Sequence, residues 1–116
     1  MRLPSRADRF RPALDAWETH DAIVLQVELA GVRPEDVRVI VDGEFVQISG
    51  RRAARYEAPP RRHLQLEIAQ GSFERVVRLR APYDSDGVTA ALDDGILTIR
   101  FPLRGTVTPR SIPVKS

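Results

Sequence analysis

Apolar and polar residues alternate along most of this chain with a period of two. In one stretch Ile23, Leu25 and Val27 fall on one side, and Gln26 and Glu28 fall on the other. Because successive side chains of a β-strand point to opposite faces, this alternation predicts strands that each carry one apolar face. Such strands are predicted near residues 14–18 and at 22–29, 37–42, 46–49, 64–68, 72–79, 88–92 and 97–101. No segment shows a long helical pattern, so the predicted fold class is all-β.

Turn residues separate the predicted strands at regular intervals. Asp42-Gly43 and Asp94-Gly95 each stand between two strands, and these dipeptides accept the positive φ that a tight hairpin turn requires. Residues 32–36 are predicted to form one helical turn or a tight loop, since Pro34 presets φ for a helix start. Many short strands with such turns indicate a β-sandwich or a barrel.

The segment 51–62 does not follow the strand pattern. It contains Pro59-Pro60 and five arginines, and Tyr56 is its only large apolar residue. A segment this polar is unsuited to a core and long for a hairpin loop, so we expect it to project from the domain.

The C-terminal tail, residues 104–116, contains a short apolar motif made of Ile112, Pro113 and Val114, here called the hook. In an extended chain residues i and i+2 share a face, so Ile112 and Val114 form a two-pronged apolar surface, while Pro113 stiffens the segment. Such a segment suits a sheet edge or a groove. Burying both side chains should contribute roughly 3–5 kcal/mol before ordering costs. Docking on a neighbouring subunit is the prediction, and docking on its own domain is the alternative.

Composition is typical of a soluble globular protein with one domain. The chain has 116 residues, 42% of them apolar, and a net charge of +2. Its arginines are interleaved with acidic residues rather than gathered in one patch, which favours a solvated surface over a nucleic-acid site. No apolar run approaches the roughly 20 residues that span a bilayer, and no signal peptide is recognisable. With no cysteine, these features favour the cytoplasm.

Motifs for catalysis or metal binding are missing from the chain. His20 and His63 have no neighbouring ligands at metal-binding spacing. No serine stands in a Gly-x-Ser-x-Gly elbow, and no phosphate-binding loop is present. Trp17 is expected to pack into the core. The protein is therefore predicted not to be an enzyme and to need no cofactor.

Five motifs occur in an order that resembles the small heat-shock protein family. Residues 90–97 resemble the family's last hairpin, with Ala90, Asp94, Gly95, Ile96 and Leu97 at its signature positions. The other four lie at residues 29–37, 48–52, 71–75 and 112–114. The resemblance implies an α-crystallin domain, an immunoglobulin-like β-sandwich of about 7–9 antiparallel strands, at residues 14–103. Residues 1–13 are expected to form an N-terminal arm that is shorter than the arm usual in the family. Residues 104–116 are expected to form an extended tail.

The resemblance also implies a function and its surfaces. The function is that of a holdase, an ATP-independent chaperone that binds partly unfolded proteins and prevents their aggregation. A groove between two strands receives the hook and is lined by Val37, Val39, Val41, Val88, Ala90 and Leu92. A segment at residues 51–62 pairs with a partner's sheet to form a strand-swapped dimer, through Arg51, Arg52, Arg55, Tyr56, Arg61 and Arg62. The implied partners are further copies of the chain and non-native proteins, with no nucleic acid and no membrane.

Other readings of the same residues remain open. Segment 51–62 is alternatively a solvated loop. The whole chain is alternatively a CS-type co-chaperone that recruits one defined partner, although the hook and the dimerisation segment argue against this. A third hypothesis is an arginine-based nucleic-acid binder, which a salt-dependent gel shift would reveal.

Overall fold

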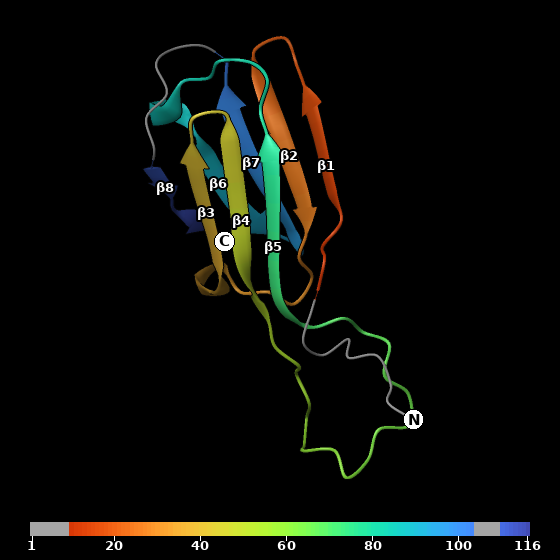
Figure 1. The fold of residues 1–116 in the computed structure, drawn as a ribbon. Helices are drawn as coiled ribbons and strands as arrows, with labels where there is room; N and C mark the ends of the chain where they lie inside the picture. Colours follow the sequence, from red (N-terminus) through yellow and green to blue (C-terminus); the bar gives the residue numbers. More distant parts are fainter. Residues whose placement is uncertain (1–9, 104–109) are drawn as a thin grey trace.

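Two β-sheets stacked face to face form the body of the molecule in a computed structural model (Figure 1). The structure describes residues 10–103 and 110–116. Residues 1–9 and 104–109 lie outside the described residues, and with them most of the expected N-terminal arm and the start of the expected tail. The all-β sandwich expected from the alternation is confirmed.

Nine strands are formed by the described residues. One sheet has the order β1-β2-β7-β6-β9 and the other the order β5-β4-β3-β8. The strands of the first sheet are β1 (Leu14–Glu18), β2 (Ala22–Glu28), β7 (Ile96–Pro102), β6 (Thr89–Asp93) and β9 (Val114–Lys115). The strands of the second are β5 (Gly71–Arg78), β4 (Phe45–Arg52), β3 (Val37–Asp42) and β8 (Arg110–Ile112). All pairings are antiparallel except that of β6 with β9, which is parallel.

The hairpin turns form where their residues predict. Asp94 and Gly95 connect β6 to β7 with φ values of 51° and 78°, the left-handed conformations of a type I′ turn. Gly43, with φ of 61°, connects β3 to β4. The expected helical turn is a single 3₁₀ turn at Pro34–Asp36, and a second one follows at Ser85–Gly87.

The core lies between the two inner faces. Alternate residues of each strand point inward, as in β3, where Val37, Val39 and Val41 are buried while Arg38 is exposed. Tyr83 is the largest fully buried side chain, and its hydroxyl donates a hydrogen bond of 2.8 Å to the carbonyl of Gly43. That bond ties the connection between the two sheets to the β3–β4 turn.

Two expectations from the sequence were wrong. Residues 64–68 form no strand, and Leu64 and Ile68 are 82% and 78% exposed. Alternation defines an apolar face but supplies no neighbouring strand, and this segment lies away from the sandwich. Trp17 is not a core residue, because its cross-strand partner Val24 lies on the outer face of the sheet. Within the described residues, no helix has the length and apolar character needed to cross a membrane.

Candidate functional site

The hook lies in a groove between the open edges of the two sheets. On one side β8 pairs with β3, placing Ile112 opposite Val39. On the other side β9 pairs with β6, placing Val114 opposite Ala90. Pro113 stands between the two short strands and is exposed. The tail therefore adds one strand to each sheet and closes this side of the sandwich.

The two prongs of the hook are buried to different depths. Ile112 is only 3% exposed and belongs to the hydrophobic core, whereas Val114 is partly buried and packs against that core. Ser111 of β8 is exposed. Because alternate residues of an extended chain face opposite ways, the apolar prongs point inward while Ser111 points to solvent. The shared face of Ile112 and Val114 inferred from the sequence is what the groove holds.

The sequence-predicted groove residues lie on β3 and on β6 or directly before it, the two strands with which the hook pairs. All six are buried, with exposures of 0–7%, and the six are Val37, Val39, Val41, Val88, Ala90 and Leu92. The hook shown here belongs to the same chain as the groove, which is the own-domain alternative raised by the sequence. Docking into a neighbour's groove stays a prediction.

The signature hairpin supports the far end of the groove strand β6. Leu97 is fully buried in the core, and Ala90 is 3% exposed. The carbonyl of Gly95 accepts a 2.7 Å hydrogen bond from the N–H of Leu29. A Cβ added at Gly95 would stand 3.1 Å from the Cα of Ala30, so the hairpin is close against the chain that follows β2.

The segment expected to project does project, with shifted boundaries. β4 continues through Arg51 and Arg52, and residues 53–70 then leave the sandwich and return to β5 (Figure 1). We call residues 53–70 the projecting loop. Arg55, Tyr56, Arg61 and Arg62 are all exposed on it. Tyr56 is 49% exposed and its ring contacts His63 with 5.6 Å between centroids.

A hollow of about 450 Å³ opens between the two limbs of the projecting loop and the chain after β2. Its apolar lining comes mainly from Ala53, Ala54, Tyr56, Leu66 and Ile68. Residues whose alternation predicted a strand therefore line an open hollow instead of a sheet.

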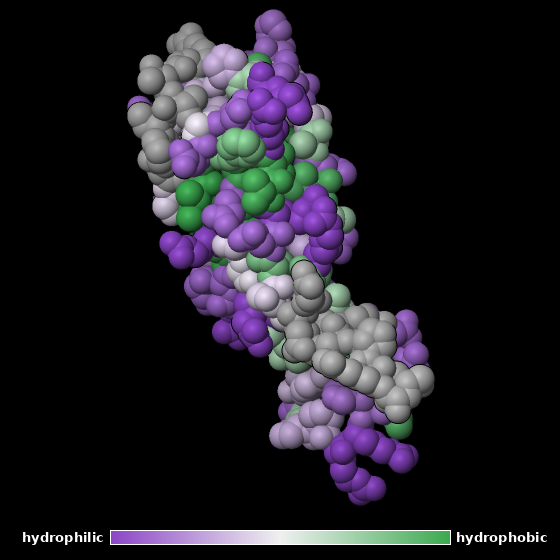
Figure 2. Space-filling model, viewed as in Figure 1, coloured by the Kyte–Doolittle hydropathy of each residue, from purple (hydrophilic) through white to green (hydrophobic). Residues whose placement is uncertain are grey.

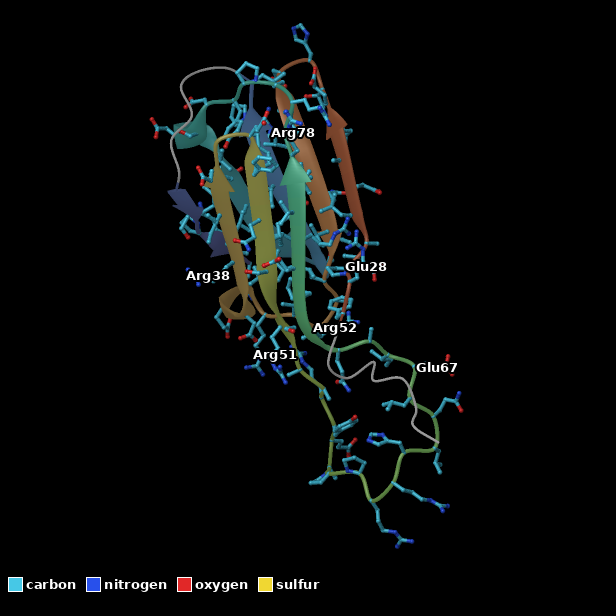
Figure 3. All side chains as sticks on the ribbon, viewed as in Figure 1. Glu28, Arg38, Arg51, Arg52, Glu67 and Arg78 are labelled. Carbon is cyan, nitrogen blue, oxygen red and sulfur yellow. The ribbon has the colours of Figure 1, made fainter. Side chains whose placement is uncertain are left out.

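Arg52 connects the two ends of the projecting loop at the point where the loop leaves the sandwich (Figure 3). Its guanidinium donates through Nε, at 2.9 Å, and through Nη2 to the carbonyl of Ala69, and through Nη1 at 3.1 Å to that of Ala30. The ring of Phe10 lies over the guanidinium, 3.8 Å from Cζ to the ring centroid. This cation–π contact and the hydrogen bonds fix both ends of the loop. Sequence reasoning missed this role, because nothing local distinguishes Arg52 from Arg51.

The edge strand β1 is a second surface that sequence reasoning did not assign. Within the described residues β1 pairs with β2 alone, so its outer side presents backbone groups to which another strand can bond. The neighbouring edge, on β5, is partly covered, because the N–H of Phe10 donates to the carbonyl of Ser72 at 3.2 Å. Arg75 donates a 2.6 Å hydrogen bond to the carbonyl of Pro12. Burial, and to a lesser degree repulsion by the positive charge of Arg11, lowers the pKa of the Arg75 guanidinium.

Comparisons with known proteins agree on one family. The model of the Hsp20/alpha crystallin family matches residues 15–115. The chain is 42% identical over 105 residues to the 18.9 kDa heat shock protein of Oryza sativa subsp. japonica, covering 88% of this chain and 59% of that protein. It is 36% identical over 107 residues to Spore protein SP21 of Stigmatella aurantiaca, covering 92% of this chain and 63% of that protein. The chain thus spans about three fifths of the length of these two curated relatives.

A solved structure supports the same family. Heat shock protein 16.0 from Schizosaccharomyces pombe superposes with a TM-score of 0.76 at 31% sequence identity, covering 85% of this chain and 94% of that one.

Proposed function

Because the chain belongs to the Hsp20/alpha crystallin family, we propose that it is a holdase, which binds partly unfolded proteins without ATP and prevents their aggregation. The observation that carries the proposal is the apolar groove between β3 and β6, which accepts an extended segment with two apolar prongs. The CS-type adaptor is not favoured, since the matching proteins are heat-shock and spore proteins.

The groove supports this function because its cover is removable. Ile112 stands opposite Val39 and Val114 opposite Ala90, and burial of the two prongs contributes roughly 3–5 kcal/mol before ordering costs. A cover held this weakly leaves the groove at a measurable rate. An apolar segment of an unfolded protein then occupies the vacated site, which lowers the free concentration of the aggregating species by mass action.

Assembly through the same groove is part of the proposal. The contacts that hold a chain's hook in its own groove form equally well in a neighbour's groove, so exchange between copies is a low-cost route to oligomers. We propose that the hook docks in a neighbour in the assembled protein, with docking on its own chain as the closed form of a free subunit.

Dimerisation is proposed to use the projecting loop and the β1 edge. The loop leaves the sandwich, and its apolar residues Leu64 and Ile68 are exposed. On its outer side, away from β2, strand β1 has no strand partner within the described residues. A limb of one chain's loop, laid along β1 of the other, would satisfy both by strand addition.

The direct test of the holdase proposal is aggregation of citrate synthase on heating, followed by light scattering without nucleotide. Stoichiometric amounts of the chain should suppress the scattering, and an equal mass of bovine serum albumin serves as the control. Scattering that rises as fast with the chain as with albumin would contradict the proposal.

The dimer is tested by deleting residues 54–60 and measuring the mass by native mass spectrometry. The deletion should convert dimers into monomers. Replacing the same seven positions with glycine and serine is the matched control, because it keeps the length and removes the side chains. Should the deleted chain remain a dimer, residues 54–60 have no role in dimerisation.

A further inference from the structure

An apolar patch lies on the outer face of the sheet that contains β3, β4 and β5. Ile40, Phe45 and Val76 come from these three strands and point away from the core. Val76 is 56% and Phe45 is 47% exposed, while Ile40 is partly buried. Figure 2 shows apolar surface across this face of the molecule.

Strand register explains why the three residues form one patch. Gln47 stands opposite Ile40 on one side and Val76 on the other. Phe45 lies two positions along β4, diagonal to both. Diagonal neighbours on one sheet face are within reach of an aromatic side chain. The patch is therefore continuous around Gln47.

Two pairs of polar side chains border the patch. Gln47 donates a 2.7 Å hydrogen bond to Glu74, and Arg78 forms a 3.0 Å ion pair with Glu44. Arg78 lies on this face at the end of β5 (Figure 3). The Arg78–Glu44 pair is neutral overall, whereas Glu74 keeps its charge because glutamine is uncharged, and Asp42 stands opposite Phe45. The patch therefore offers apolar contact with carboxylates at its border.

The size of the patch favours a transient occupant. Its three side chains expose roughly 200 Å², so two copies meeting through it would bury about 400 Å², well below the ~1,200 Å² of a stable interface. An extended segment with two or three apolar side chains matches the area. The patch is also open while the hook fills the groove, because Phe45 and Val76 are exposed in this structure, in which β8 is paired with β3.

We propose that Ile40, Phe45 and Val76 form a second binding site for apolar, extended segments of partly unfolded polypeptides, available while the hook is docked. The inference rests on the proposed holdase function and adds a site to it. The groove holds a segment only after the hook leaves, whereas this face holds one at any time.

The test uses the full chain with Phe45→Thr and Val76→Thr combined, since threonine keeps the preference for strand. Val24→Thr is the matched control, because Val24 lies on the outer face of the other sheet. Suppression of citrate synthase scattering is titrated for each chain, and circular dichroism on heating checks that each variant is folded. If the double variant is unfolded, Val76→Thr alone takes its place.

The double variant should need roughly tenfold more protein for half-suppression, and the control should behave as wild type. A photo-crosslinker at position 76 should attach to citrate synthase. Equal suppression by wild type and the double variant overturns the inference and leaves the holdase proposal standing. Crosslinks only between copies of the chain, or only to its own residues, also overturn it. If wild type itself fails to suppress scattering, the holdase proposal falls and takes this inference with it.

Discussion

Changing Ile112 and Val114 to alanine should release the hook from its groove. Ile112 is 3% exposed and lies in the core between the sheets, and Val114 is partly buried beside it. The double variant removes most of this apolar surface and leaves the backbone pairing of β8 and β9 possible. Ser111→Ala is the matched control, because Ser111 is on the same strand and is exposed.

The size of the effect follows from burial. A fully buried isoleucine contributes about 2 kcal/mol more than alanine, and the partly buried valine about 1 kcal/mol. The docking equilibrium should therefore weaken by about 3 kcal/mol, or roughly 100-fold, since 1.4 kcal/mol corresponds to tenfold. The sandwich itself should stay folded, because its remaining core is unchanged.

Hydrogen exchange measured by mass spectrometry detects this release directly. Backbone amides of residues 110–112, 114 and 115 should exchange up to roughly 100-fold faster in the double variant and at the wild-type rate in Ser111→Ala. Native mass spectrometry of the same samples reports assembly. If hooks dock in neighbours, as proposed, the double variant loses its larger species, and dilution of the wild type also speeds exchange in the tail.

Two results would refute the reasoning. Unchanged exchange in the double variant would mean that the buried prongs do not hold the tail. Fast exchange with an unchanged mass and no dilution effect would restrict docking to the chain's own groove and remove the hook from assembly.

Three further changes test the framework around these surfaces. Gly50→Ala should lower the free energy of unfolding by at least about 2 kcal/mol in a urea titration, because a Cβ there overlaps the carbonyl oxygen of Asp36; wild-type stability would contradict this packing. Tyr83→Phe should cost about 1 kcal/mol at neutral pH through loss of its hydrogen bond. Burial, and to a lesser degree the charge of Asp42, raises the pKa of the Tyr83 hydroxyl above its ordinary 10.0. Because the folded state then holds this proton more tightly than the unfolded state, the stability of the wild type should fall as pH rises above 10, and that of Tyr83→Phe should fall less. Parallel stability curves for the two proteins would contradict this assignment. Arg52→Met should speed trypsin cleavage in the projecting loop, because it removes the hydrogen bonds that hold the two ends of the loop together, whereas Arg51→Met should not. Equal cleavage rates in the two variants would mean that Arg52 does not hold the loop.

Local pattern predicted most of the strands and one of the surfaces. The alternation of Val37, Val39 and Val41 places their side chains inward whatever else the chain does, and the spacing of Ile112 and Val114 makes a two-pronged face by the same geometry. The same rule failed at residues 64–68, where an apolar face exists but the chain has left the sandwich. It also failed to place Trp17, which is exposed because its partner in the β1–β2 register, Val24, lies on the outer face of the sheet.

The all-β class, the faces of the strands, the turn at Asp94-Gly95 and the shape of the hook could all be predicted from local sequence, because each depends on residues close together in the chain. The direction of the hook, antiparallel to β3 and parallel to β6, could be seen only in the folded molecule. The same holds for the hydrogen bonds of Arg52 to Ala30 and Ala69, and for the place of Phe45 and Val76 on one open face. These arrangements join residues far apart in sequence, and which partners meet depends on how the whole core packs rather than on any local preference.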